Sequence, residues 1–319
     1  MACVILLWLS ANIKRQFARL ESWAVCLLLI PANHGFRCAA GPVGALRTGG
    51  LMEHITTLSL RLDPPKDFDV RRLDACSLGP MLQSVLLDNA DAAYAARLHE
   101  TGFNPYSQYC YRDADGSIVW RVSALNDEAS LRLIDPARRI ESFKLRNLDA
   151  EFSVSKHLCE TESLSRLLEK LEGGEDSSFR VQFVTPTAFR SNNHYVIMPD
   201  VRLIFQNLLM RYSQVYAGDG EVDAETVSYI AEHARITSYN LRSHYFPRTM
   251  GSRDKIPAFV GTVTIHVSGP QSLRGLASML LSFGEAAGMG IKTAMGMGGM
   301  RLLPAGQKQG TTMRGGSVG

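Results

Sequence analysis

The residues best suited to chemistry lie near the carboxyl end of the chain, in the sequence GMGIKTAMGMGG at positions 288–299. Successive backbone amides in such a segment can form an anion-binding nest. Lys292 adds a positive charge and Thr293 adds a hydroxyl donor. The segment therefore predicts a phosphate-binding site, with a glycine hairpin that only closes a sheet as the equal alternative. The residues that permit positive φ angles and close backbone approach are Gly288, Gly290, Gly296, Gly298 and Gly299.

Two common phosphate-binding motifs do not fit this segment. In a P-loop the lysine follows the last glycine and a helix comes next. A dinucleotide-binding fingerprint follows a strand and opens a helix. Here the apolar spacing predicts a helix over 273–287 before the segment and a short strand over 300–303 after it. The order helix, loop, strand excludes both motifs.

His99 is the candidate for proton transfer, because the reference pKa of a histidine, about 6.5, lies near working pH. The residue lies at the end of a predicted helix, next to a loop, where a side chain can reach a ligand. A surface histidine that interacts with the helix C-terminus is the alternative interpretation. A second histidine, His244 in the sequence SHYFPR, stands beside aromatic and basic residues that could contact RNA bases. A partly buried loop explains that sequence equally well.

The elements that must position these residues follow from the apolar periodicity. In the first half, alternation predicts a strand over 54–62, helical spacing follows over 78–98, and a second helix is expected over 163–171. The polar sequence EGGEDSS at 172–178 is the best domain boundary. The remaining expected strands are 106–111, 118–124, 131–134 and 143–154 in the first half, and 179–184 and the strand-rich region 236–267 in the second; a helix is expected over 201–216.

Each half thus opens strand–helix–strand–strand and carries a second helix late. This order predicts an α+β fold of two tandem ferredoxin-like domains (βαββαβ, RRM-like) with a C-terminal glycine-rich loop. The expected domains are 52–175 and 176–305, and 306–319 is expected to be a flexible tail.

Residues 1–51 differ in composition from the rest. Their apolar stretch at 24–30 is shorter than the roughly 20 residues that span a bilayer. A targeting segment, a short accessory helix over 13–30 and a translation start at Met52 are the three interpretations. We favour the start at Met52, because a clear strand begins directly after it, and we expect 1–51 to be a poorly ordered or non-native extension.

Charge and cysteine content limit the functional classes. Residues 1–51 hold five of the 34 basic residues and one of the 31 acidic residues, so the remainder carries 29 basic against 30 acidic side chains. A non-specific nucleic-acid coat needs a strong positive excess, so any RNA must bind at a local site. The six cysteines form no CxxC pair and no zinc-ligand spacing, which indicates reduced thiols and a cytoplasmic protein.

Besides the glycine-rich segment, three other segments have distinctive sequences: FVGTVTIHV at 259–267, VQFVTPTAFR at 181–190 and LHETGFNPYS at 98–107. Together with that segment they resemble the RAMP superfamily. More specifically, they resemble its CRISPR-associated endoribonucleases that process precursor CRISPR RNA (pre-crRNA). The resemblance covers about residues 52–305.

The resemblance implies metal-independent cleavage of CRISPR repeat RNA, without a cofactor. The ribose 2′-hydroxyl attacks the adjacent phosphate and leaves 2′,3′-cyclic phosphate and 5′-hydroxyl ends. It also implies catalytic roles for His99 and Lys292. The implied RNA contacts are Gly288, Gly290, Lys292, Thr293, Gly296, Gly298 and Arg248.

The sequence departs from the family pattern in two places. Leu86, Leu87 and Asp88 stand where some members have a tyrosine, and residues 100–108 contain no lysine. Charge stabilisation must therefore come from elsewhere, with Lys292 as the first candidate and Arg97 and Arg248 as weaker ones.

Two other functions stay open, the first because of these departures and the second on grounds of fold alone. One is a RAMP-type subunit that binds guide RNA in a CRISPR effector complex without cutting it. The other is a metabolic enzyme on the same fold, because that fold hosts many functions. The expected partners are pre-crRNA and an effector complex, with no membrane; a homodimer is left open.

Overall fold

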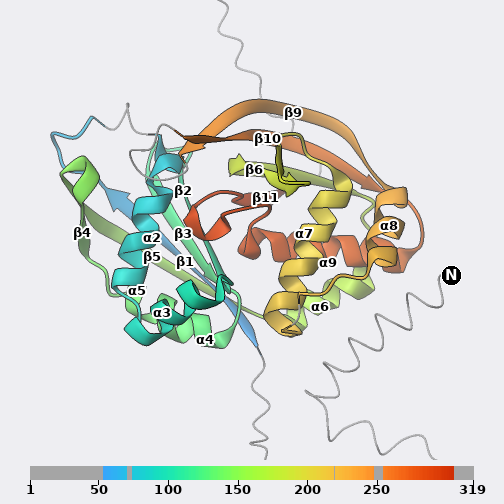
Figure 1. The fold of residues 1–319 in the computed structure, drawn as a ribbon, viewed down its shortest axis with the longest axis horizontal. Helices are drawn as coiled ribbons and strands as arrows, with labels where there is room; N and C mark the ends of the chain where they lie inside the picture. The colour runs from blue at the N-terminus through green and yellow to red at the C-terminus, as the bar shows by residue number, and fades with distance from the viewer. Residues whose placement is uncertain (1–52, 70–73, 219, 248–253, 305–319) are drawn as a thin grey trace, which may run out of the picture. The chain divides into compact units, whose positions relative to one another are not determined.

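The computed structural model describes residues 53–69, 74–218, 220–247 and 254–304. Figure 1 shows how their helices and strands are arranged. The expected extension 1–51, the expected tail 306–319 and Arg248 lie outside the described residues. Among the described helices, none is long and apolar enough to cross a membrane.

The first sheet is built around β1 (His54–Asp63), which confirms the strand predicted over 54–62. Leu58, Leu60 and Leu62 alternate with more exposed residues and are almost completely buried, as expected for a strand with one covered face. All neighbouring strands are antiparallel, in the order β2-β3-β1-β5-β4. The other strands are β2 (Tyr106–Arg112), β3 (Ile118–Ala124), β4 (Ser142–Leu145) and β5 (Ala150–Ser163).

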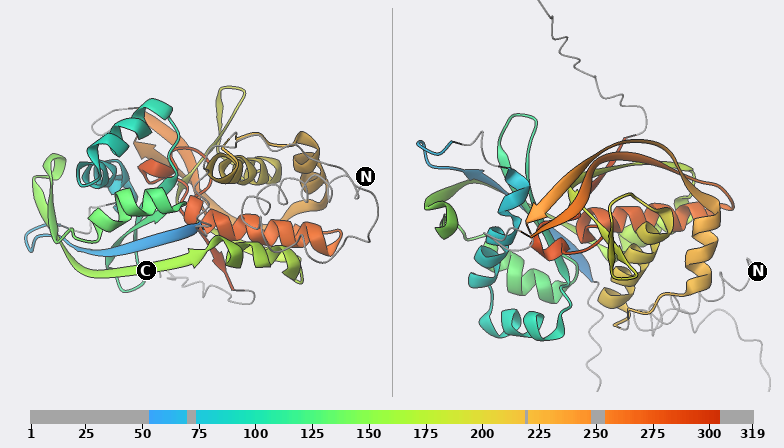
Figure 2. Two further views of the ribbon diagram at one scale, coloured as in Figure 1. Left: turned by 90° about the horizontal axis from the view of Figure 1, so that it is seen from below. Right: turned by 45° about the horizontal axis from the view of Figure 1, so that its top comes forward.

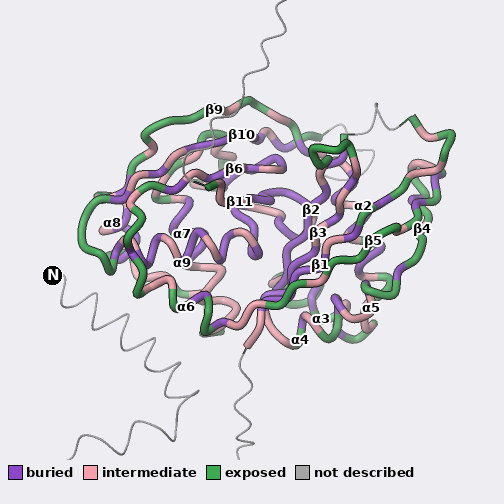
Figure 3. The backbone as a smooth tube through the Cα atoms, turned by 180° about the vertical axis from the view of Figure 1, so that it is seen from behind, coloured by how far each residue is buried: buried purple, intermediate pink, exposed green. Residues whose placement is uncertain are grey.

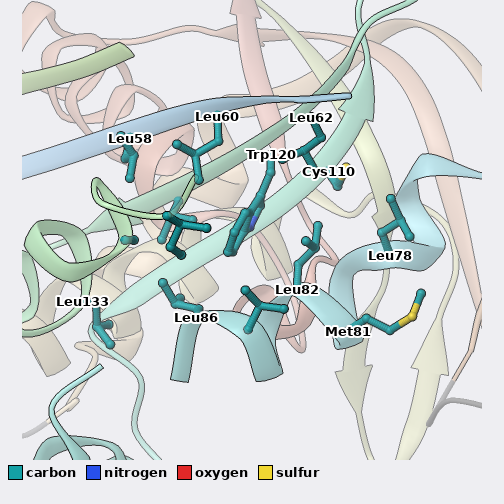
Figure 4. Close-up of a cluster of buried hydrophobic side chains, with 14 of the residues drawn as sticks. Leu58, Leu60, Leu62, Leu78, Met81, Leu82, Leu86, Cys110, Trp120 and Leu133 are labelled. Atoms are coloured by element: carbon teal, nitrogen blue, oxygen red, sulfur yellow. The ribbon is translucent and has the colours of Figure 1, made fainter. Parts of the chain in front are cut away.

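Two helices, and not one, follow β1 and the short 3₁₀ turn η2 (Ala75–Leu78): α2 (Gly79–Asp88) and α3 (Ala92–Thr101). The single helix predicted over 78–98 is wrong because Asp91 starts a new one. Its carboxylate accepts the Tyr94 N–H at 2.9 Å, which caps α3. Figure 4 shows leucines of α2 pointing at Trp120 and at the leucines of β1, where they form the first core.

The segment between β3 and β4 is helical, so the strand expected over 131–134 is wrong. Asn126 accepts the Ala129 N–H at 2.8 Å and starts the helical stretch. Leu133 and Ile134 are completely buried in the first core, which explains their apolar character without a strand. The stretch consists of α4 (Asp127–Ala129), η3 (Ser130–Ile134) and α5 (Asp135–Ala137), and the strand expected over 143–154 is divided into β4 and β5 by η4 (Arg146–Leu148).

The second sheet has the order β11-β6-β10-β9, again antiparallel throughout. Figures 1 and 2 show β9 and β10 curving over helices α7 and α9. In Figure 3, β9 at the sheet edge is mainly exposed, while α9 is buried along most of its length. The strands are β6 (Ser178–Thr187), β9 (Ala234–Pro247), β10 (Lys255–Val267) and β11 (Met300–Leu303), with a separate hairpin of β7 (Phe189–Ser191) and β8 (His194–Val196).

The helices of the second half are α7 (Val201–Tyr216), α8 (Ala224–His233) and α9 (Gln271–Ala287). The predictions over 201–216 and 273–287 are confirmed, whereas α8 was not predicted. The helix predicted over 163–171 is also present, as α6 (Leu164–Gly173), but it packs along α9. A Cβ on Gly275 of α9 would lie 2.1 Å from the Leu171 carbonyl oxygen, which shows how closely the two helices approach.

The resulting architecture is α+β with two antiparallel sheets, as predicted at that level. In each sheet the first strand along the chain pairs with the third and with the last, and the second strand pairs with the third. Strand β4 extends the first sheet beyond this common pattern.

Candidate active site

The glycine-rich segment, residues 288–299, links α9 to β11 and contains the short 3₁₀ turn η5 (Thr293–Met295). Four of its glycines adopt the positive φ angles that the sequence predicted to be possible: φ is 71° at Gly288, 86° at Gly290, 102° at Gly296 and 71° at Gly298. At Gly298 a Cβ would lie 2.0 Å from the Met289 carbonyl oxygen. A side chain is therefore excluded there by both the backbone angle and the available space.

Most amides of this segment bind acceptors within the protein. Nine of its twelve N–H groups donate to protein oxygens. Gly290 donates to Asn207 Oδ1 at 2.8 Å, and Gly298 donates to the Pro186 carbonyl at 3.0 Å. The segment is thus a buried turn that is fixed from several sides, and a phosphate cannot occupy those nine amides while their internal bonds remain. The other donors are at Met289, Ile291, Met295, Gly296, Met297, Gly299 and, to the last turn of α9, Gly288.

The segment also joins the two sheets. Gln108 of β2 is completely buried and donates from Nε2 to the Gly79 carbonyl at 2.8 Å and to the Ala294 carbonyl at 3.0 Å. Its Oε1 accepts the Trp120 Nε1–H at 2.9 Å. A Cβ on Gly79 would lie 2.3 Å from the Met295 carbonyl oxygen, so the start of α2 and η5 are in direct contact.

Lys292 lies at the outer part of this turn with φ of 55°, and its side chain is half-buried. Its Nζ is 3.4 Å from Met295 Sδ. Thr293 is 3% exposed. Of the residues predicted to contact RNA, Lys292 is therefore more accessible than Thr293 and the neighbouring glycines.

His99 lies in the last turn of α3 and is exposed. The apolar side chains of Tyr94 and Leu98 anchor the helix in the first core, and Gly102 ends it in the left-handed conformation with φ of 64°. Ala294 of η5 belongs to that same core. Residues of α3 and of the glycine-rich segment thus contribute to one core, from which His99 projects into solvent.

Arg97, a weaker candidate for charge stabilisation, forms an ion pair with Glu128 on the surface. Its guanidinium also lies over the Tyr94 ring, 5.0 Å from the centroid. The carboxylate already balances its charge, which makes Arg97 a poor source of positive potential for a phosphate.

A cleft of about 510 Å³ opens between η2 and the end of β2 on one side and strands of the second sheet on the other. It contains the predicted His244, whose Nε2 lies 3.5 Å from Asp74 Oδ2. Arg112 and Arg242 line it as well. Burial and the nearby Asp74 raise the pKa of Cys76 to about 12, so this thiol in the cleft stays neutral at physiological pH.

Sequence reasoning missed one cation near the glycine-rich segment, Arg211 of α7. It donates from Nη2 to the Tyr106 carbonyl at 3.4 Å, and its Nε is shielded from solvent without a hydrogen-bond partner in the described structure. Its position on an otherwise regular amphipathic helix gives no local signal, because arginines usually cover the outer surface of such helices.

Comparison with solved structures defines the class of this fold. A Cas6 product complex aligns with 79% of this chain and 100% of its own, with a TM-score of 0.62 and 22% sequence identity. Cas6 from Thermus thermophilus aligns with 80% of this chain and 100% of its own, with a TM-score of 0.60 and 20% identity. The fold is that of the solved Cas6 structures.

Sequence comparison identifies the family. The family model for CRISPR-associated endoribonuclease Cas6 matches residues 181–300. The relative from Mycobacterium tuberculosis is 33% identical over 257 residues, which is 80% of each chain, and that from Streptococcus thermophilus is 34% identical over 238 residues, 74% of this chain and 96% of its own. The chain belongs to the Cas6 family of CRISPR-associated endoribonucleases. It is an RNA-cleaving enzyme, which confirms the family and the activity class predicted from the sequence.

Proposed function

We propose that this enzyme cleaves CRISPR repeat RNA in precursor transcripts without a metal ion, with His99 transferring a proton. The observation that carries the proposal is the placement of His99. It is an exposed imidazole in the last turn of α3, and that helix shares its core with η5 of the glycine-rich segment. Relatives named as Cas6 endoribonucleases, and a neighbour solved with a substrate mimic, support repeat RNA as the substrate class.

In the proposed reaction the ribose 2′-oxygen attacks the adjacent phosphorus in line, and the bond from phosphorus to the 5′-oxygen breaks. The 2′-hydroxyl loses a proton and the leaving 5′-oxygen gains one, so the products carry 2′,3′-cyclic phosphate and 5′-hydroxyl ends. His99 would exchange one of these protons, for which an exposed imidazole is suited. Lys292 would add positive charge near the phosphate, because Lys292 is the partly accessible cation of the turn.

RNA binding is proposed along the same turn, through Lys292 and the backbone of Gly288, Gly290, Thr293, Gly296 and Gly298, with Arg248 as a further contact. Because nine amides of the turn bind protein oxygens, its contribution would come mainly from Lys292 and from the rigid surface that the glycines allow. We also propose that the two sheets belong to tandem ferredoxin-like domains, 52–175 and 176–305. The strand order common to both sheets supports that division. Delivery of the product to a CRISPR effector complex belongs to the same proposal.

A cleavage assay tests the proposal. Purified protein is incubated with end-labelled repeat RNA in excess chelator, beside RNA with a 2′-deoxy substitution at the cut site. We expect the unmodified RNA to be cut and the deoxy RNA to stay intact. His99→Ala should slow cutting by roughly 10²–10⁴-fold, the usual contribution of a general acid or base.

His233→Ala is the matched control, because His233 also lies in the last turn of a helix, where its Nδ1 is 2.9 Å from the Tyr229 carbonyl oxygen. It should cut at nearly the wild-type rate. Cleavage that stops in chelator, or that His99→Ala leaves unchanged, would contradict the proposed mechanism.

A further inference from the structure

The reaction proposed above needs positive charge at the scissile phosphate, and the anticipated cations within the described residues are Arg97 and Lys292. Arg97 is paired with Glu128. Lys292 places its Nζ 3.4 Å from Met295 Sδ, on its own turn. A third cation, Arg211, lies on α7, a helix that contacts both the glycine-rich turn and the start of β2.

The contacts of α7 fix this position. Asn207, one helical turn before Arg211, accepts the Gly290 N–H at 2.8 Å and so binds the turn that contains Lys292. Arg211 itself donates from Nη2 to the carbonyl of Tyr106, the first residue of β2. Only the short connection after α3 separates Tyr106 from the helix that carries His99. Arg211 is therefore on the face of α7 that contacts both the glycine-rich turn and the start of β2, the strand that follows α3 in the chain.

The surroundings of Arg211 are unusual for a cation. Its Nε has no hydrogen-bond partner and no solvent contact, while the residue as a whole is only half-buried. Across the described ranges, no carboxylate lies within ion-pair distance of Arg211, and its recorded hydrogen bond is the long one to Tyr106. Burial lowers the pKa of Arg211 to about 10, so the side chain is still charged at neutral pH.

An inward-facing cation without a counter-charge costs stability unless a ligand supplies the charge. A phosphate would do so, and a guanidinium can bind two phosphate oxygens with parallel N–H donors. A purely structural role, in which Arg211 ties α7 to β2 through the Tyr106 carbonyl, would use one neutral acceptor at 3.4 Å. That single hydrogen bond offsets only a small part of the free-energy cost of burying a charged group.

We propose that Arg211 is a catalytic residue that contacts a non-bridging oxygen of the scissile phosphate and stabilises the negative charge that builds up there during cleavage. The proposal rests on the proposed function, because it assigns the charge-stabilising role in that same reaction. Arg211 takes no part in proton transfer. Other groups remove the proton from the 2′-hydroxyl and add a proton to the 5′-oxygen.

The test separates chemistry from binding and folding. Arg211→Gln keeps a donor for the Tyr106 carbonyl but removes the charge. Arg202→Gln is the matched control, because Arg202 lies on the same helix, is exposed, and donates to Ser228 Oγ at 3.2 Å. For each variant we would measure the melting temperature, the dissociation constant for 2′-deoxy repeat RNA and the single-turnover cleavage rate.

We expect Arg211→Gln to lower the single-turnover rate by about 10²-fold, the scale of losing one transition-state hydrogen-bond donor. The dissociation constant should change by no more than about threefold, as expected for a contact that strengthens in the transition state. Arg202→Gln should match the wild type in all three measurements.

A phosphorothioate at the scissile phosphate gives a readout that a structural role would not move. Sulfur at the oxygen that Arg211 contacts should slow the wild type, and this slowing should be markedly smaller in Arg211→Gln for one of the two diastereomers. Arg211→Lys, which keeps the charge but loses the planar fork, gives the same comparison if Arg211→Gln does not fold. Equal sulfur effects in wild type and variant for both diastereomers would overturn the proposal.

Two results separate this proposal from the proposed function. Wild-type protein that does not cut repeat RNA in chelator refutes the function itself. Wild-type protein that cuts, together with a folded Arg211→Gln that cuts equally fast, refutes the role of Arg211 alone.

Discussion

Gln108 provides the sharpest test of how the glycine-rich turn is held. This side chain is completely buried and makes three hydrogen bonds, to the carbonyls of Gly79 and Ala294 and to the Trp120 indole N–H. Gln108→Leu has nearly the same volume but removes all three hydrogen bonds. Each unsatisfied buried group costs about 1–3 kcal/mol, and bonds to one side chain are not fully additive, so we expect a loss of roughly 3–6 kcal/mol.

Equilibrium unfolding in urea, followed by tryptophan fluorescence, measures this loss. With a slope of about 3 kcal/mol per molar, the midpoint should fall by roughly 1–2 M. Gln83→Leu is the matched control. Gln83 is half-buried and donates to the Tyr106 hydroxyl at 3.1 Å, so the same substitution removes one bond and should cost roughly 1–2 kcal/mol. A Gln108→Leu protein within about 1 kcal/mol of Gln83→Leu would refute the idea that Gln108 fixes the turn between the two sheets.

Two further predictions concern stability. Gly298→Ala should lower the free energy of unfolding by roughly 3 kcal/mol or more, because φ is 71° and a Cβ would lie 2.0 Å from a carbonyl oxygen. Gly218→Ala, with φ of 86° but open space around it, should cost roughly 1 kcal/mol. Glu285 accepts the Leu302 N–H at 2.8 Å, yet burial raises its pKa, so its ionised form weakens the fold. Glu285→Gln should therefore raise the urea midpoint at pH 8.

The pH dependence of the Glu285 effect has a defined sign. A raised carboxyl pKa means that the folded protein binds the proton more tightly than the unfolded chain does. The wild type should thus lose stability as the pH rises from the usual glutamate pKa through the raised one, while Glu285→Gln should not. The advantage of the variant should shrink on acidification, and an advantage that stays constant with pH would contradict the assignment. Equal midpoints for Gly298→Ala and Gly218→Ala would likewise contradict the close approach at Gly298.

Elements with strong periodicity were predictable from the sequence. The strand β1 and the helices α7 and α9 carry apolar residues at regular spacing, and their long-range contacts agree with that local pattern. The division between α2 and α3 depends on one carboxylate, that of Asp91, which caps the second helix inside a continuous apolar pattern. The apolar residues Leu133 and Ile134 suggest a buried strand in the sequence. In the structure they are buried on one side of a helical stretch.

The individual residues of the candidate site were predictable from the sequence, whereas the contacts between them were not. The glycines that need positive φ were found from composition, and His99 was found from its place at a helix end and from the family resemblance. The acceptors of the turn amides come from distant residues such as Pro186 and Asn207, and no local pattern points to them. Arg211 was missed for the same reason, because its hydrogen-bond acceptor lies on the distant strand β2. Within the described residues, no carboxylate lies at ion-pair distance from it.

The bond between Gln108 and Ala294 spans 186 positions of the chain, which has a consequence during synthesis. At about 5–20 residues per second, the ribosome needs roughly 10–40 s to travel from one to the other. Throughout that interval the amide of Gln108 has the Gly79 carbonyl but not the Ala294 carbonyl as an acceptor, and the core around Trp120 lacks Ala294. The core of the amino-terminal half is therefore completed only after Ala294 has been synthesised.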